Sequence, residues 1–455
     1  MQAIYIPELD DDFMEIMEEI TPQDQELVIP MFYMPTLDSL TRQMSSLNSL
    51  RYFISSSPAI VWNFYELFPN ITDHILNVSM GSDSLRHSLL ALTAIIRDLF
   101  SGNMNEVYLV EKTTSLRFLQ DAISSDSVDE AIAIAVMMHM GMDVLLGQLR
   151  HTRNHLKGAY LILQRLKEKA WLSGKGLSPL GLLIQRMMIR LDASLTSLWG
   201  DTTEFESLDP AVEIEDRKWL TTNQAASKHM SSTNIEWTLA SFEMDNLQHR
   251  AYNAAKRAQS WRQVNDPQMD EKIQMEYRKL VQGMDMWKQR AIVREQEEIE
   301  RYARQVNKPS DDPQLRFLHH EPLYIQNTFF AKLLNQWRMQ SISNSLMVSP
   351  KSGPEPLSHN RYTLAVDICR THAALGKEAY IGPSWQSLFY AGMVFGGKKR
   401  YPLESEWIME RLRIVAAGFP SVRLVIESMP LQWEDEMSHW NGFAVWFRYH
   451  GLLDS

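Results

Sequence analysis

The feature that most constrains the fold is the spacing of apolar residues, which recurs at three and four positions in most stretches after Arg42. The clearest case is Ser84–Phe100, whose apolar residues at this spacing are Leu85, Leu89, Leu92, Ile96 and Leu99. This spacing puts the apolar side chains on one face of an α-helix. Period-two runs between Asn-Gly or Asp-Gly turns are absent. The sequence therefore predicts an all-α protein, a large irregular helical domain of many antiparallel helices.

The same spacing predicts a series of further helices. They cover Glu106–Ile123, Asp126–Gln148, Arg150–Lys169, Leu180–Leu198, Ile235–Val264, Met269–Gln305, Tyr324–Ser341, Tyr362–Leu375, Ser384–Phe395 and Glu404–Gly418. Ser82 or Ser84 can cap the helix over Ser84–Phe100, and Ser127 with Glu130 forms a capping-box pattern. Residues 200–235 and 341–360 lack the periodicity, so we expect loops there.

The charge of the chain is concentrated at one end. Residues 1–41 contain ten acidic residues and no Lys or Arg, whereas the other 414 residues carry 46 acids against 45 bases. Apolar residues alternate with these acids, and Leu9, Phe13, Met14 and Met17 stand among them. This composition is typical of a disordered interaction segment that binds through its apolar groups, and a mobile tail without a partner is the alternative. We therefore predict an acidic-hydrophobic tail over 1–41, ahead of a helical domain over 42–455.

Composition excludes several classes of protein. Cys369 is the only cysteine, so this chain can form neither an internal disulfide nor a cysteine-cluster zinc or iron–sulfur site. We expect a reducing, intracellular setting, and the N-terminus shows no secretory signal. The longest apolar stretch, Ala131–Leu146, is interrupted by His139 and Asp143, so it predicts a buried core helix and not a membrane span.

Motifs that would indicate a nucleotide-binding, metal-binding or catalytic site are weak or incomplete. Walker and dinucleotide-binding loops are missing. His151 and His155 share one helical face, but the sequence shows no third metal ligand, and polar or capping roles are the alternative. Asp11-Asp12-Phe-Met-Glu15 is similar to the magnesium motif of helical isoprenoid synthases, without a second such motif. We expect no catalytic residues, no metal site and no cofactor.

Lys398, Lys399 and Arg400 form a short basic cluster that is a candidate nuclear import signal. A solvated loop is the alternative interpretation of these three residues. Bulk charge gives no sign of a nucleic-acid surface, because the body of the chain is nearly neutral.

Several segments together resemble the fungal-specific transcription factor domain, the helical regulatory region that follows the zinc binuclear cluster. The elements that carry the resemblance are Ser56–Phe68, His87–Ala94, His155–Ala159, Arg190–Ala193 with Leu198–Gly200, Gly382-Pro383, Ala391-Gly392, Trp407–Leu412 and Pro430–Trp433. We interpret these as packing elements: Gly158, Ala159 and Gly200 allow close helix approach, and Asp192 forms a buried pair or a cap.

The resemblance implies a nuclear transcription regulator or co-regulator that is not an enzyme, and that controls, for example, a metabolic or secondary-metabolite gene cluster. Without a cysteine cluster, direct DNA binding by this chain is doubtful. We therefore expect action through protein partners, either transcription machinery or a zinc-cluster regulator, with homo- or heterodimerisation and a small-molecule effector as open options. A magnesium-dependent isoprenoid-synthase-like enzyme and a pure heterodimerising protein remain the alternatives.

Overall fold

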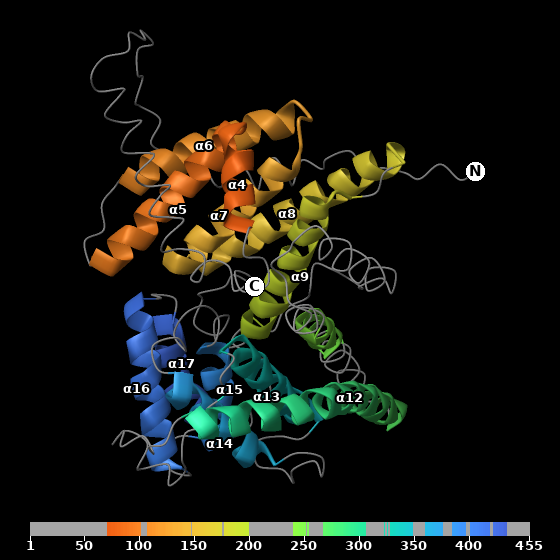
Figure 1. Cartoon of the computed structure of the whole chain (residues 1–455), viewed down its shortest axis with the longest axis vertical. Helices are drawn as coiled ribbons and strands as arrows, with labels where there is room; N and C mark the ends of the chain where they lie inside the picture. The colour runs from red at the N-terminus through yellow and green to blue at the C-terminus, as the bar shows by residue number, and fades with distance from the viewer. Residues whose placement is uncertain are drawn as a thin grey trace. The chain divides into compact units, whose positions relative to one another are not determined.

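The computed structural model describes residues 71–101, 107–146, 148–174, 177–199, 240–251, 253, 267–305, 323, 325, 328–348, 360–375, 385–396, 401–418 and 422–434. Within these residues we find helices and short connections, without a β-strand (Figure 1). The all-α prediction is therefore confirmed. The helices are α4 (Ile71–Met80), α5 (Asp83–Ser101), α6 (Val107–Ser124), α7 (Glu130–Leu146), α8 (Leu149–Leu172), α9 (Pro179–Trp199), a helical segment over 240–251, α12 (Pro267–Gln305), α13 (Thr328–Val348), α14 (Arg361–Leu375), α15 (Trp385–Phe395), α16 (Pro402–Gly418) and α17 (Val422–Glu434).

The chain divides into two compact units. We call the described residues 71–185 the N-terminal unit and the described residues 186–434 the C-terminal unit, so that α9 begins in one and ends in the other. Our division into a tail over 1–41 and a body over 42–455 stays a prediction, because residues 1–70 lie outside the described part of the chain.

The N-terminal unit is built around α7. This helix packs against α5, α6 and α8, and α4 packs against α5. Thirteen of the 17 residues of α7 are buried, including His139 and Asp143. A helix that is apolar on all sides must lie inside the protein, and the prediction of a core helix over Ala131–Leu146 is confirmed. In α8, which packs against α7, Leu156, Ala159 and Leu163 are buried. Ala159 is one of the small residues predicted to allow close helix approach.

The structure identifies the N-cap residues of two helices in this unit, α5 and α7. Ser82 Oγ accepts a hydrogen bond from the backbone N–H of Leu85 at 3.4 Å, so Ser82 and not Ser84 caps α5. The capping box predicted at Ser127 and Glu130 is wrong. Asp129 Oδ1 accepts the backbone N–H of Ile132 at 3.0 Å instead, and α7 begins at Glu130. A carboxylate next to the first turn also interacts favourably with the helix dipole.

The C-terminal unit packs α13, α14 and α15 against one another. α12 lies on α13, and α16 and α17 lie on α15. All eleven residues of α15 are buried. The predicted elements Ala391-Gly392 and Pro430–Trp433 meet here, because Trp433 Nε1 donates a hydrogen bond to the Gly392 carbonyl at 2.8 Å. A Cβ on Gly392 would lie 2.7 Å from the sulfur of Met429, so this glycine allows the close approach of α17.

The loop predicted from residue 341 begins too early. α13 continues to Val348, and Ile342, Ser343 and Ser345 are buried within it. The serines lower helix propensity only slightly, and burial of the apolar residues around them outweighs that loss. Among the helices that the structure describes, none combines the length and the apolar character needed to cross a bilayer.

Candidate functional site

The residues singled out for function from sequence fall outside the described part of the chain. They are the tail residues Leu9, Phe13, Met14 and Met17, the acidic motif Asp11, Asp12 and Glu15, and the basic cluster Lys398, Lys399 and Arg400. Their roles stay predictions. Within the described residues, buried polar side chains form hydrogen-bonded and charged networks in both the N-terminal and the C-terminal unit.

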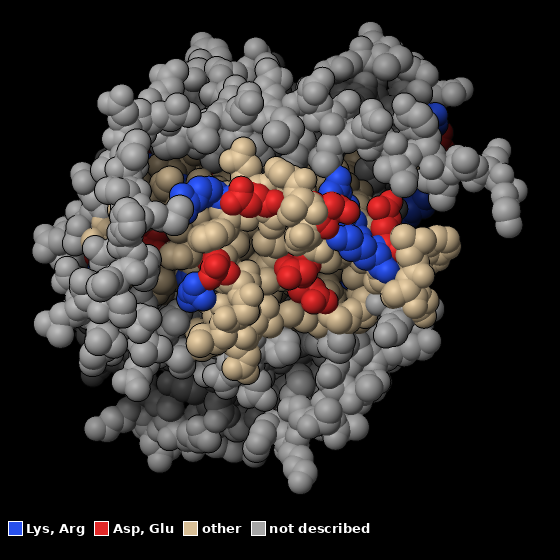
Figure 2. All heavy atoms as spheres, turned by 90° about the horizontal axis from the view of Figure 1, so that it is seen from above, with Lys and Arg blue, Asp and Glu red and all other residues tan. Residues whose placement is uncertain are grey.

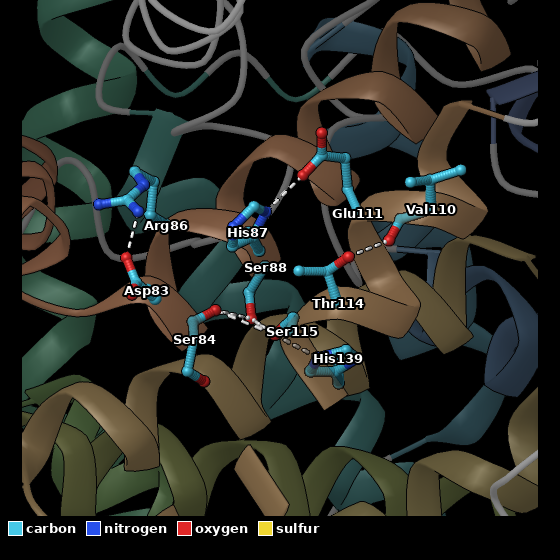
Figure 3. A network of polar contacts seen from close by, with 10 residues as sticks. All are labelled: Asp83, Ser84, Arg86, His87, Ser88, Val110, Glu111, Thr114, Ser115 and His139. Atoms are coloured by element: carbon cyan, nitrogen blue, oxygen red, sulfur yellow. Dashed lines mark hydrogen bonds and ion pairs between the residues drawn. The ribbon is translucent and has the colours of Figure 1, made fainter. Parts of the chain in front are cut away.

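The first network joins α5, α6 and α7 through hydroxyl groups (Figure 3). The hydroxyl groups of Ser88 and Ser115 lie 2.6 Å apart, and each lies 2.9 Å from the Ser84 carbonyl oxygen. Ser115 Oγ is also 3.0 Å from His139 Nε2. Ser88, Ser115 and His139 are fully buried. Nearer the surface, His87 Nδ1 lies 2.6 Å from Glu111 Oε2. These contacts fix how α6 lies on α5 and α7.

A buried carboxylate lies one turn further along α7. Asp143 is fully buried, and its Oδ1 accepts a hydrogen bond from Lys112 Nζ of α6 at 2.8 Å. His155 Nε2 of α8 lies 3.3 Å from Asp143 Oδ2. A buried charge is tolerated where it is paired, and here the ammonium group of Lys112 supplies the opposite charge. Asp143 thus ties α6 to the central helix, whereas its Oδ2, which faces His155 of α8, accepts no hydrogen bond.

Burial holds both histidines of this cluster in the neutral form. Desolvation lowers the pKa of His155 to about 4, against the opposing attraction of Asp143. The pKa of His139 is lowered well below 6.5 by desolvation first, and then by the neighbouring His155 and Lys112. Buried cationic groups lose their proton because the charged form needs water. The two rings lie 5.7 Å apart between centroids.

The geometry of the cluster around Ser115, His139 and Asp143 does not suit catalysis or metal binding. Ser115 and His139 stand at the distance of a nucleophile and its base, but both are fully buried, and His139 Nδ1 has no hydrogen-bond partner that would orient the ring. No group of three or more His, Cys, Asp or Glu residues within the described part of the chain is arranged to hold a metal ion. His155 lies in the core, whereas His151, predicted on the same face, is exposed. The cluster therefore has a packing role.

The second network surrounds the Arg190-Leu-Asp192 element of α9 in the C-terminal unit. Asp192 is buried and its Oδ2 lies 3.0 Å from His249 Nε2. Of the two roles predicted for Asp192, the structure therefore shows the buried pair. Arg190 Nε lies 3.5 Å from Asp245 Oδ1, and Arg190 also donates to Ser241. Gln336 of α13 contacts Asp245 at 3.2 Å. Burial raises the pKa of the Asp245 carboxyl, opposed by Arg190.

A third buried group links α12, α13 and α14. Arg338 Nη2 lies 2.8 Å from Glu295 Oε1, and Arg338 also donates to Thr371 Oγ1 at 3.0 Å. Lys288 contacts the same glutamate and lies over the ring of Trp337. Desolvation lowers the pKa of both Lys288 and Arg338, opposed by Glu295. A guanidinium suits such a site because it donates in several directions at once.

Sequence reasoning identified Asp192 but missed its partner, His249, and missed the serine network. The signal for the second was present, since His139 and Asp143 stand four residues apart in an apolar run. Polar residues at that spacing share one helical face, which predicts partners on a neighbouring helix. The identity of those partners depends on helix packing, which one sequence does not specify.

Comparison with known proteins identifies the family of the chain. The sequence matches the fungal specific transcription factor domain over residues 48–291. No curated protein and no solved structure matches the chain. The matched region is more than half of the 455 residues and includes α4 to α9, with the serine network, Asp143 and the Arg190–Asp192 element. The chain therefore belongs to the fungal specific transcription factor domain family.

Proposed function

We propose that this chain is a nuclear, non-enzymatic transcription regulator that reaches its target genes through contacts with other proteins. Membership of the family supports regulation of transcription in a fungal setting. The observation that carries the finer proposal is the single cysteine. A binuclear zinc cluster needs six cysteines, so these 455 residues need a partner to hold a defined DNA site by that route.

The charge on one face of the molecule supports a protein-binding function over a DNA-binding one. On the face drawn in Figure 2, the described acidic and basic side chains are interspersed and form no continuous basic area. Tight binding to duplex DNA requires several Lys or Arg residues along the phosphate backbone. Partners that fit the proposal are transcription machinery and an intact zinc-cluster regulator, and metabolic gene clusters are the targets we propose.

The acidic tail supplies a surface for such contacts. We propose that Leu9, Phe13, Met14 and Met17 are its anchors, since acidic groups raise the rate of encounter and apolar groups provide the affinity. The test is a reporter assay with the full chain fused to a heterologous DNA-binding module. Leu9→Ala with Phe13→Ala should abolish most of the activation. Val28→Ala with Ile29→Ala, also in the tail, is the matched control and should retain it. Equal activation by both variants would refute the role of these anchors.

Nuclear location and DNA binding can be tested separately. Replacing Lys398, Lys399 and Arg400 by Ala in a fluorescent fusion should leave the protein in the cytoplasm if this cluster is the import signal. For DNA, the purified chain should show only weak binding to duplex fragments of its target promoters. Adding a zinc-cluster partner should produce a specific complex that contains both proteins. Tight and selective binding by the chain alone would contradict the proposal.

A further inference from the structure

Helix α8 combines two properties that are unusual on the surface of one helix. Its 24 residues include six Lys or Arg and one acid, Glu168, which gives a formal net charge of +5. Its last two residues, Trp171 and Leu172, are large, apolar and each 77% exposed. Leu161, 41% exposed, lies on the same side. Large apolar residues that are exposed next to one another are a common feature of binding surfaces.

The exposed residues follow one stripe of the helix. Lys157, Leu161, Glu168 and Leu172 are exposed and stand at helical spacing, whereas Leu156, Ala159, Ile162, Leu163 and Leu166 form the buried side. The basic residues near the end are held in place: Arg165 pairs with Asp126 at 2.8 Å, and Lys169 donates to the Asp126 carbonyl at 2.9 Å. The outward side of α8 is therefore an ordered surface on which apolar groups lie beside Lys157 and Glu168, with the exposed Lys169 at its edge.

The same chain contains a segment of complementary chemistry. Residues 1–41 carry ten acids and no bases, with bulky apolar residues between the acids. This segment contributes −10 of the formal net charge of −11. Acidic groups placed near basic ones favour encounter and orientation, and apolar groups placed on Trp171 and Leu172 provide affinity. Linkage in one polypeptide also raises the effective concentration of the segment.

We propose that the outward face of α8, formed by Lys157, Leu161, Glu168, Trp171 and Leu172 and bordered by the exposed Lys169, is the docking surface for the acidic segment of residues 1–41 of the same chain. Docking covers the apolar residues of the tail and competes with any partner that binds them. The tail then has a bound state and a free state, and a partner with higher affinity shifts the population to the free state. The docking proposal rests on charge and exposure, whereas the activating role of the tail belongs to the proposed function.

A fluorescence experiment on the full chain tests the contact. In a Cys369→Ala background, Thr21→Cys carries a bimane dye, which tryptophan quenches at contact distance. Trp171 is the only tryptophan between Trp62 and Trp199. We expect Trp171→Ala to raise the emission about twofold, because docking within one chain keeps the tail bound in most molecules. Lys157→Glu should raise it by a smaller factor, and added salt should do the same.

Two matched variants serve as controls. Met286→Ala removes an exposed apolar residue and Lys272→Glu reverses an exposed charge, both on α12, and neither should change the emission. Because Trp171 is so exposed, its replacement should leave the thermal midpoint unchanged. Emission that does not respond to Trp171→Ala would overturn the proposal. Quenching that increases with protein concentration would assign the face to the tail of a second copy and would also overturn it.

A nucleic-acid ligand would give a different pattern. If Lys157→Glu weakened retention of the chain on duplex DNA and left the emission unchanged, the basic face would belong to DNA and the proposal would be wrong. The reporter assay separates this inference from the proposed function. A tail that docks but never activates would refute the activating role alone, whereas activation without any Trp171-dependent quenching would refute docking alone.

Discussion

In both units burial shifts the pKa of ionisable groups for the same physical reason. The direction of the shift is opposite for the histidines of the N-terminal unit and for Asp245 of the C-terminal unit. In the N-terminal unit, burial lowers the pKa of His139 and His155, so both rings are neutral at pH 7. In the C-terminal unit, burial raises the pKa of the Asp245 carboxyl, which lies beside Arg190. Desolvation disfavours the charged form in each case. A cationic group then releases its proton and an anionic group retains it, so acid should change the contributions of these groups to stability in opposite directions.

The comparison also concerns the type of cation. Lys112 is the cation that pairs with Asp143 in the N-terminal unit. In the C-terminal unit the buried cations include Arg338 and Arg361, each with two nitrogens engaged by side chains or carbonyls. Lysine concentrates its charge at one atom, whereas arginine spreads it over a planar fork. The N-terminal network therefore depends more strongly on a single carboxylate.

The largest expected effect follows from removing that carboxylate. Asp143→Ala leaves the partly exposed ammonium of Lys112 without its charged partner, which costs about 3 to 4 kcal/mol, toward the lower end for a broken buried pair. Hydrogen exchange should show protection lost in peptides of α6, α7 and α8, with protection in α13 to α15 retained. Asp83→Ala, which removes an exposed pair with Arg86, should cost less than about 1 kcal/mol. Equal losses from the two variants would contradict the asymmetry.

Acid should destabilise the N-terminal unit by a somewhat smaller amount. The pKa of His155 is about 4 in the folded chain and 6.5 in the unfolded chain, so the unfolded state binds the proton first. The stability that neutral His155 provides is complete above pH 6.5 and is lost as the pH falls to 4, a change of about 3 kcal/mol. Hydrogen exchange at pH 7 and pH 5 should locate the loss in α7 and α8.

The C-terminal unit provides the internal reference for this acid effect. Because the pKa of Asp245 is raised, its contribution to stability increases as the pH falls through that raised value, which opposes acid unfolding. His155→Gln should remove part of the pH dependence from the N-terminal unit and leave the C-terminal unit unchanged. Loss of protection at the same pH in both units would show that the buried histidines are not the cause.

Sequence reasoning predicted the helices because their signal is local. Periodicity located α5, α8, α9, α14 and α16 to within a few residues, and the apolar run with His139 and Asp143 correctly indicated a core helix. Its errors arose where a weak local signal competed with tertiary contacts. The serines of α13 suggested a loop, but burial keeps them helical, and Asp129 replaced the predicted Ser127 cap.

The buried networks were harder to predict because their partners are distant in sequence. Asp192 pairs with His249, 57 residues away, and Lys112 pairs with Asp143, 31 residues away. A single sequence shows that a polar residue interrupts an apolar face, but the packing of helices decides which group meets it. The functional residues predicted in the tail have local signals only, and they lie outside the described residues.

A smaller effect should follow from filling the space between α15 and α17. A Cβ at Gly392 would lie 2.7 Å from Met429 Sδ and 3.3 Å from a methyl carbon of Ile408. Gly392→Val should therefore destabilise the C-terminal unit by about 2 kcal/mol, through overpacking. Gly392→Ala should cost less, because alanine gains up to about 1 kcal/mol of helix propensity and Met429 can rotate. Thermal unfolding followed by tryptophan emission suits this test, since Trp171 is the only tryptophan within residues 71–185.

The smallest expected effect concerns Cys369 of α14, which reports on the C-terminal unit without perturbing it. The thiol is fully buried, and burial raises its pKa far above the ordinary value, with a further contribution from Glu404. Thiolate is the reactive form, so a thiol reagent should modify the native protein at pH 8 only as fast as the C-terminal unit opens. The rate should therefore rise in Gly392→Val and remain unchanged in Asp143→Ala. A rate that increased in Asp143→Ala alone would show that the two units do not open independently.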